Sequence, residues 1–452
     1  MIVLLLKILA FVVVLGILIP VHEYGHFWVA RRCGVKVLRF SIGFGRAIWR
    51  RVSGADGTEW VIAAIPLGGY VRMLDERDTD SGPIDPADLP RAFNRQSVAK
   101  RIAIVIAGPV ANLLLAVGLY WGLNVVGVME PRPIVSDPVA DTPAQRAGFQ
   151  AGDVVTSIDG QQVRSWKEMS WLLLQRAVDK SRFEVLIERP EGVTRALSLD
   201  LRDFETGDLD SNPLPKIGLR PGGGVPRIVG PLPAGEVAEV AGLRAGDRVL
   251  QVAGQPMRSQ RELIDLIRAS SGKPLEFLVE RDGRQLTFTL TPARVRDAKG
   301  NEFGRIGAQI DARPPEAKVR YGPLESVGLA VGKTWDTVVF TLRMMWKMIT
   351  LEASLKNLSG PIAIADYAGQ AALLGPAQFL ELLAVISIGL GVLNLLPIPM
   401  LDGGHLLYYL IEIVKGSPPA DWIVQWGQRA GVGVLFLLTA LALFNDITRL
   451  LL

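Results

Sequence analysis

The chain has 452 residues, of which 49% are hydrophobic, and its mean hydropathy of +0.29 favours a membrane protein over an ordinary soluble enzyme. The formal net charge is only +4 and is spread along the chain, so the composition does not indicate a nucleic-acid-binding protein. Cys33 is the only cysteine, which excludes an internal disulfide bond.

Four stretches are apolar over the roughly 20 residues that a helix needs to cross a bilayer. We expect a polytopic α-helical membrane protein with four transmembrane helices, at residues 1–31, 98–128, 376–401 and 422–452. A cleaved secretory signal is the alternative for the first stretch, but that stretch lacks a basic head and a small-residue cleavage site. The fourth stretch is the weakest of the four because Arg429 interrupts it.

The first stretch ends in the motif His-Glu-x-x-His, formed by His22, Glu23 and His26. This spacing puts two imidazoles one helical turn apart, where both can bind one Zn²⁺, and puts a carboxylate beside the metal as a general base. The alternative is that the histidines only line a helix interface. Two of the chain's three histidines form the motif, and a glutamate in an apolar helix is costly without a function, so we favour the metal site.

Residues 32–97 form a segment between the first two spans that is rich in basic side chains. The positive-inside rule places this segment in the cytoplasm and the amino terminus outside. Counting forward places residues 130–325 outside, residues 397–420 inside and the carboxyl terminus outside. At 1.5 Å per residue His22 lies about 30 Å along its helix, near the cytoplasmic side.

Two stretches of this cytoplasmic segment, "VKVLRFSIGFG" and "EWVIAAIPLGGYVRM", alternate apolar and polar residues around glycines that include Gly43 and Gly45. The alternation predicts a β-hairpin. On this pattern alone it could be an ordinary peripheral hairpin.

The region after the second span contains an internal repeat with an offset of 94 residues. "PAQRAGFQAGDVVTSIDGQQV" begins at Pro143 and "VAEVAGLRAGDRVLQVAGQPM" begins at Val237. The pattern resembles PDZ domains in the circularly permuted form of bacterial proteases, and a generic glycine-rich turn is the alternative. We expect two periplasmic mixed α/β PDZ domains, at residues 129–220 and 221–310. They would bind extended peptides or act as a steric gate, with the second copy favoured as the peptide binder.

Residues 311–375 are expected to form a linker with an interfacial amphipathic helix at residues 327–349. This helix has four charged residues in an apolar background, which suits a helix lying at the membrane surface. A fifth span is the alternative.

The third span, at residues 376–401, runs into "LNLLPIPMLDGGH", and we expect residues 402–421 to form a cytoplasmic loop. A catalytic zinc usually has three protein ligands, and Asp402 is the best candidate for the third because topology places it level with His22 and His26. Glu59 is a weaker candidate in a polar loop. Pro397 and Pro399 break regular helix and expose backbone groups that can line a cavity.

The combined motifs are similar to those of the site-2 family of intramembrane zinc metalloproteases. The similarity covers almost the whole chain: HEYGH, a segment of the form NxxPxPxLDGG, PDZ repeats between the second and third spans, and "FSIGFG", "AGPVANLLLA", "NLSGPI" and "LDGGHLL". The resemblance implies one zinc ion per chain with His22, His26 and Asp402 as ligands and Glu23 as general base.

The resemblance also implies that Asn394 positions the substrate or steadies the oxyanion, with Pro397, Pro399, Gly43 and Gly45 near the substrate. The hairpin within residues 32–97 resembles the membrane-associated hairpin of this family, which pairs with substrate as an added strand. His405 is better interpreted as structural. The implied location is the bacterial inner membrane, with lipid around the spans and the active site near the cytoplasmic side.

The implied reaction is cleavage within the transmembrane segment of a single-pass membrane protein after a first periplasmic cut. The substrate would be an anti-sigma factor of an envelope-stress response, and remnant signal peptides are a second class. A membrane-anchored PDZ adaptor that binds peptide tails without cutting them is the alternative.

Overall fold

The computed structural model describes residues 2–54, 56–78, 84–189, 192–204, 214–257, 259–296, 302–312, 314–350, 352, 354 and 358–451. Asn357 of the "NLSGPI" segment lies outside these described residues. The chain divides into two compact units. Unit 1 contains residues 1–128 and 320–452, and unit 2 contains residues 129–319.

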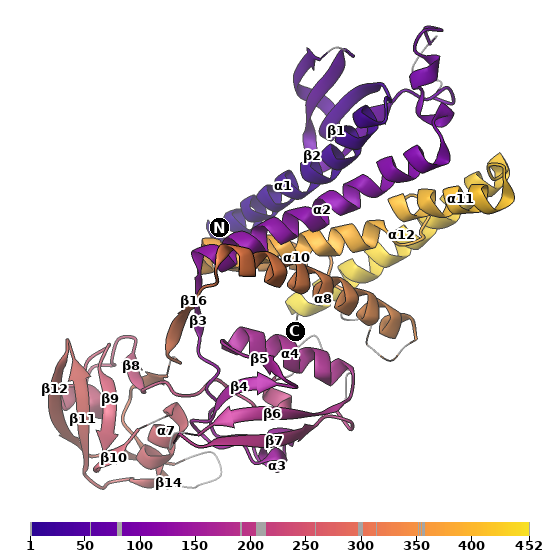
Figure 1. The fold of residues 1–452 in the computed structure, drawn as a ribbon. Helices are drawn as coiled ribbons and strands as arrows, with labels where there is room; N and C mark the ends of the chain where they lie inside the picture. The colour runs from indigo at the N-terminus through magenta and orange to yellow at the C-terminus, as the bar shows by residue number, and fades with distance from the viewer. Residues whose placement is uncertain are drawn as a thin grey trace. The chain divides into compact units, whose positions relative to one another are not determined.

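Unit 1 is built mainly from helices. They are α1 (Ile2–Arg32), α2 (Val98–Val126), α8 (Pro323–Ile349), α9 (Pro361–Leu374), α10 (Pro376–Asn394), α11 (Asp402–Lys415) and α12 (Asp421–Leu451), with short 3-10 turns η2 (Leu89–Arg91) and η3 (Phe93–Arg95). Helices α1, α2 and α10 run alongside one another, as Figure 1 shows. Among the described residues, α1, α2, α10 and α12 are long and apolar enough to cross a membrane, in agreement with the four expected spans.

Helix α8 covers the segment for which an interfacial helix and a fifth span were the alternatives. It is not among the four membrane-crossing candidates of the described residues. Its Ala330 is fully buried in a cluster with residues of α2 and α10. Lys333 also contacts both helices, because its Nζ lies 4.5 Å from the centre of the Tyr120 ring and 3.2 Å from Glu381. The helix therefore packs against the bundle, and its position at a membrane surface stays a prediction.

The segment expected to be a cytoplasmic loop, residues 402–421, contains a helix, and its cytoplasmic location stays a prediction. Helix α10 ends at Asn394, a short irregular segment follows, and α11 occupies Asp402–Lys415. Two glycines at the start of α11 suggest a turn because glycine is a poor helix former. Here they permit close packing instead: a Cβ on Gly403 would lie 2.0 Å from the Leu396 carbonyl oxygen, and one on Gly404 would lie 2.5 Å from that of Ile398.

The expected β-hairpin is present as two long strands, β1 (Val37–Ser53) and β2 (Thr58–Met73), and it folds back on itself. Residues 39–42 have two sets of partners, residues 59–62 on one side and residues 69–72 on the other. Residues 47–53 pair with residues 58–63. The segment 69–72 therefore forms one edge of a small sheet.

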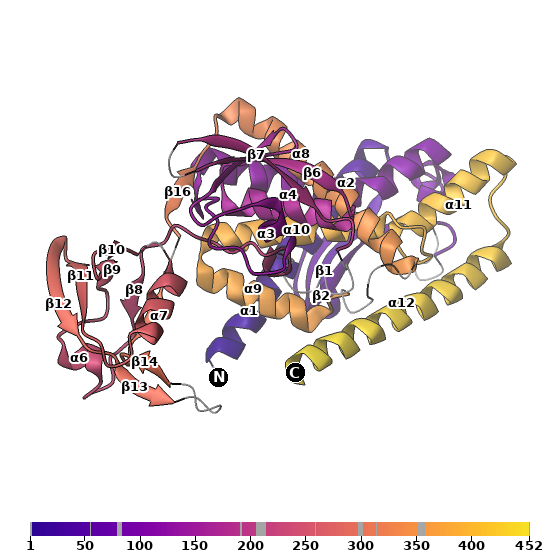
Figure 2. The same ribbon diagram turned by 90° about the horizontal axis from the view of Figure 1, so that it is seen from below.

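Unit 2 contains the two repeats, and each forms a sheet with a helix. The first repeat has α3 (Pro143–Ala147), β4 (Val154–Ile158), β5 (Gln161–Gln162), α4 (Trp166–Val178), β6 (Arg182–Glu188), β7 (Thr194–Asp200) and α5 (Leu214–Ile217), with sheet order β5-β4-β6-β7. The second has β8 (Arg227–Val229), α6 (Val237–Val240), β9 (Arg248–Val252), β10 (Gln255–Pro256), α7 (Gln260–Ala269), β11 (Leu275–Arg281), β12 (Arg284–Leu290), β13 (Ala293–Arg296), β14 (Glu302–Arg305) and β15 (Gln309–Asp311). Its main sheet has the order β12-β11-β9-β8-β15, and the first four strands appear side by side in Figure 2.

The repeated Ala-Gly-Asp has the same structural role in both copies. Asp153 and Asp247 are fully buried, and each carboxylate accepts a hydrogen bond of 2.8 Å from the backbone nitrogen three residues earlier. Arg281 donates two further bonds of 2.7 Å to Asp247, and Arg189 lies 3.6 Å from Asp153. The motif is repeated because both turns need a buried carboxylate to satisfy their backbone donors.

A pairing that the sequence did not indicate joins the ends of unit 2. Strand β3 (Val128–Pro131) enters the unit and pairs with β16 (Glu316–Val319), which leaves it. The segment expected to be a linker therefore begins with an ordered strand.

Candidate metal centre

Helix α1 places its two histidines on one buried face. His22 and His26 are each 8% exposed, and their rings meet edge to face with centres 4.8 Å apart. Their Nε2 atoms are 3.2 Å apart. The helix continues past the motif to Arg32, so both side chains are held on regular backbone.

Asp402 reaches the same place from the other end of the chain. It is the first residue of α11, and the preceding Met400 has a positive φ of 89°, which a non-glycine residue rarely adopts. The irregular segment between α10 and α11 turns through hydrogen bonds from Ile398 N to Leu396 O and from Leu401 N to Ile398 O. This turn aims the start of α11 at the histidines.

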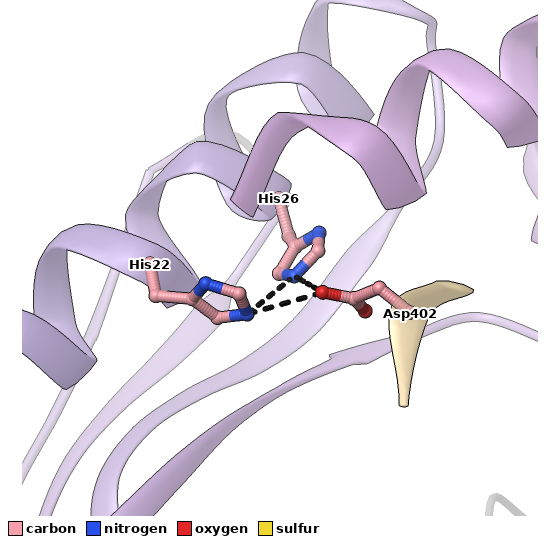
Figure 3. Close-up of side chains that lie close together, drawn as sticks. All are labelled: His22, His26 and Asp402. Atoms are coloured by element: carbon pink, nitrogen blue, oxygen red, sulfur yellow. Dashed lines mark hydrogen bonds and ion pairs between the residues drawn. The ribbon is translucent and has the colours of Figure 1, made fainter. Parts of the chain in front are cut away.

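The three side chains converge on one point, as Figure 3 shows. Asp402 Oδ2 lies 3.2 Å from His22 Nε2 and 3.5 Å from His26 Nε2. Four ligands at about 2.0–2.1 Å from a tetrahedral zinc are separated by about 3.3 Å, so these distances suit zinc. Burial raises the pKa of Asp402, but the neighbouring His22 and His26 lower it further, to about 2, so the carboxylate is ionised. The two imidazoles and the carboxylate therefore fit a zinc ion.

Glu23 lies beside these three side chains, against the edge of the small sheet. It is half-buried, and a Cβ built on Gly69 would lie 3.1 Å from Glu23 Cγ. Gly69 begins the edge segment 69–72, so β2 and the carboxylate are in direct proximity. A carboxylate in this place can take up a proton from a water molecule at the metal point.

Asn394, Pro397 and Pro399 lie at the end of α10 and in the segment that leads from it to α11. Asn394 is the last residue of α10 and is half-buried, and Pro397 is exposed in the segment that follows. Pro399 packs against α12, where a Cβ on Gly431 would lie 2.1 Å from the Pro399 carbonyl oxygen. The structure thus brings the proline segment to the start of α11.

Gly43 and Gly45 lie in β1 with positive φ values of 91° and 86°. A Cβ on Gly43 would lie 2.7 Å from the Ile65 carbonyl oxygen, so these glycines shape the bend of the sheet. Neither glycine is part of the cluster of metal donors.

Glu59 and His405, the two other residues considered near the metal, are not part of the donor cluster either. Glu59 is buried in the sheet and pairs with Arg39 and Arg50 of β1. His405 lies on α11 one turn after Asp402 and is exposed.

Helix α2 holds contacts that the sequence interpretation missed. His26 Nδ1 lies 2.8 Å from the Ile104 carbonyl oxygen, and Asn112 Nδ2 lies 3.2 Å from His22 Nδ1. A Cβ on Gly108 would lie 2.2 Å from His26 Nε2, so only glycine leaves space for that ring. The available signal was Asn112 itself, a polar side chain in an apolar span.

Comparison with known proteins identifies the family. The model of peptidase family M50 matches residues 10–438. The chain belongs to peptidase family M50. This membership confirms the resemblance to the site-2 proteases, and the chain is a zinc metalloprotease rather than a PDZ adaptor.

Individual relatives are similar over nearly their whole length. The chain is 42% identical over 446 residues to "Regulator of sigma-E protease RseP" of Escherichia coli K12, covering 98% of both chains. It is 41% identical over 445 residues to the protein of that name from Salmonella typhimurium, again covering 98% of both. It is 43% identical over 460 residues to a protein of Ralstonia nicotianae whose name includes zinc metalloprotease, covering 99% of both.

Proposed function

We propose that this protein cleaves peptide bonds within the transmembrane segments of single-pass membrane proteins, using one zinc ion bound by His22, His26 and Asp402. The observation that carries the proposal is the convergence of their Nε2 and Oδ2 atoms to within 3.2–3.5 Å among apolar helices. Charged and polar groups in such surroundings are costly, and a metal site accounts for all three.

Each side chain has a defined part in the reaction. When bound, zinc supplies Lewis acidity that activates a water molecule and polarises the scissile carbonyl. Glu23 accepts the proton of that water and passes it to the leaving amine. Asn394, at the end of α10, orients the substrate backbone or steadies the oxyanion, with Pro397 and Pro399 shaping the wall beside it.

Substrate binds as an extended strand, because a peptide bond within a helix is shielded by its neighbours. We place this strand at the edge segment 69–72. In the described structure this segment pairs on one side only, with residues 39–42, and its first residue, Gly69, lies beside Glu23. Gly43 and Gly45 contribute by bending β1, so that the edge stays next to α1. Main-chain hydrogen bonds to such an edge recognise any extended peptide.

The substrate class follows from the relatives. Those named regulators of sigma-E protease suggest an anti-sigma factor, cut after a first periplasmic cleavage, and remnant signal peptides are a second class. The active site then lies near the cytoplasmic side of the inner membrane, and the two PDZ domains lie in the periplasm.

The second repeat is the better peptide binder. A groove of about 460 Å³ lies between α7 and the segment 303–310. Ile264 and Ile267 of α7 and Ile306 and Ile310 opposite them line its apolar wall, and Arg268 and Arg305 also line it. A groove of this chemistry suits an apolar peptide end that carries a carboxylate.

The proposal is tested by separating metal binding from catalysis. Glu23→Gln should retain zinc and lose cleavage of a model transmembrane substrate, and His22→Phe should lose both. His405→Phe is the matched control because His405 is outside the donor cluster, and it should retain zinc. Unchanged cleavage by Glu23→Gln, or full zinc content in His22→Phe, would overturn the proposal.

A further inference from the structure

Asn112 is a fully buried amide in the middle of α2, directly behind the proposed metal ligand His22. Its side chain is 0% exposed, and its Nδ2 lies 3.2 Å from His22 Nδ1. Its Oδ1 is buried and has no hydrogen-bond partner among the described residues. A buried amide oxygen without a partner is costly, so this arrangement needs an explanation.

The geometry of the donors fixes the tautomer that His22 must adopt. The atoms that converge on Asp402 are the Nε2 atoms of both histidines. A neutral imidazole that binds metal through Nε2 carries its hydrogen on Nδ1. His26 meets this requirement, because its Nδ1 lies 2.8 Å from the Ile104 carbonyl oxygen, which accepts the hydrogen bond. His22 needs an acceptor at the same place, and Asn112 is the residue there.

Only one orientation of the Asn112 amide supplies that acceptor. Rotating the amide by 180° exchanges Oδ1 and Nδ2 without changing its shape. In either orientation one amide atom lacks a partner among the described residues, so the requirement of His22 decides between them. We infer that Asn112 is a positioning residue for the metal centre: its Oδ1 accepts the hydrogen bond from His22 Nδ1 and holds Nε2 toward the metal.

The backbone of Asn112 is itself fixed by α10. Ser387 Oγ is 0% exposed and donates a hydrogen bond of 2.8 Å to the Asn112 carbonyl oxygen. Gly391, one turn further along α10, packs against the same stretch, since a Cβ there would lie 3.6 Å from Asn112 Cβ. Helix α10 therefore holds the backbone and the Cβ of Asn112 in place, as a positioning residue requires.

The test rests on the proposed ligation by His22 and uses zinc affinity as its readout. Full-length protein in detergent is equilibrated with a zinc-buffering chelator, and bound zinc is measured by atomic absorption. Asn112→Leu keeps the size of the side chain without an acceptor, and its zinc affinity should fall about 10–100-fold. Asn112→Asp supplies a carboxylate oxygen to Nδ1–H and should retain zinc within a few-fold of the parent. If the Asn112→Leu variant does not fold, Asn112→Ala is the alternative that also removes the acceptor, and its zinc affinity should fall as well.

The control and the failure modes are distinct. Asn124→Leu changes an asparagine on the same helix remote from His22, and it should leave zinc affinity unchanged. If His22→Phe loses zinc while Asn112→Leu and Asn112→Ala retain it, the inference about Asn112 is wrong and the proposed ligands stand. If Asn112→Asp loses as much affinity as Asn112→Leu, the acceptor role is likewise wrong. Full zinc content in His22→Phe would instead overturn the proposed function.

Discussion

Helices α1 and α2 are neighbours of similar length and apolar character, yet they contribute to the centre in opposite ways. Helix α1 supplies two proposed ligands and the proposed general base within five residues, His22 to His26. Helix α2 supplies none of these groups. It contacts both histidines instead, through the Ile104 carbonyl oxygen and Asn112.

Helix α2 also contacts the two helices α10 and α11. Arg101 donates hydrogen bonds of 3.1 and 2.7 Å to the two carboxylate oxygens of Glu412 on α11. The Asn112 carbonyl oxygen accepts from Ser387 of α10. Helix α1 thus supplies the proposed reactive side chains, and α2 fixes the positions of the side chains and helices around them.

The largest effect is expected from Gly108→Ala on α2. The added methyl would lie 2.2 Å from His26 Nε2, so the ring or the whole helix must move away from the metal point. Alanine is intrinsically the better helix former by about 1 kcal/mol, so a loss must come from this collision. We expect zinc content to fall to the level of His22→Phe, measured by atomic absorption after dialysis.

The matched control is Gly118→Ala on the same helix, where an added Cβ would meet nothing within 4 Å. It should keep full zinc content and cleavage activity. Normal zinc content in Gly108→Ala would show that α2 does not constrain His26.

The sequence predicted the α1 half of the centre better than the α2 half, and the reason is chemical. His22, Glu23 and His26 have a characteristic spacing on one helix, and topology alone brings Asp402 level with them. The contact to Ile104 uses a backbone carbonyl oxygen, which every residue type has. Gly108 acts through the absence of a side chain. Neither leaves a chemical signature in a single sequence.

The fold shows the same limit. The four spans follow from apolar length, and the repeat follows from the Ala-Gly-Asp turns. Residues 402–421 were expected to be a cytoplasmic loop from the count of spans alone, and that count does not reveal helix α11. In the structure Gly403 and Gly404 allow the first turn of α11 to pack on the Leu396 and Ile398 carbonyl oxygens. Close backbone packing of this kind depends on the tertiary fold, so the local helix propensity of the sequence does not predict it.

An intermediate effect is expected from Glu412→Gln. The Arg101–Glu412 pair is nearly buried, with side chains 11% and 14% exposed, and Arg101 also lies 4.9 Å from the centre of the Tyr409 ring. Removing one charge of a buried pair leaves the other uncompensated and costs about 3 kcal/mol. Because α11 begins with Asp402, we expect both a lower thermal unfolding midpoint and several-fold weaker zinc binding.

Lys415→Gln is the control for this change, since Lys415 lies in the last turn of the same helix and is exposed. It should alter neither quantity. A lower unfolding midpoint with unchanged zinc affinity in Glu412→Gln would limit the ion pair to stability and remove it from the positioning role given to α2.

The smallest effect is expected from Ser387→Ala, which removes the hydroxyl that binds the Asn112 carbonyl oxygen. One buried hydrogen bond is worth about 1 kcal/mol, and without Ser387 Oγ the Asn112 carbonyl would still lie within regular helix. We therefore expect zinc affinity to fall only two- to five-fold, about 0.4–1 kcal/mol, in the same chelator competition. Thr439→Val is the control, because Thr439 bonds only to the Leu435 carbonyl of its own helix in the described contacts. Combining Ser387→Ala with Asn112→Leu should add little to the loss from Asn112→Leu, since both act through the same contact to His22. Additive losses would mean that Ser387 stabilises the centre by a route other than the Asn112–His22 contact.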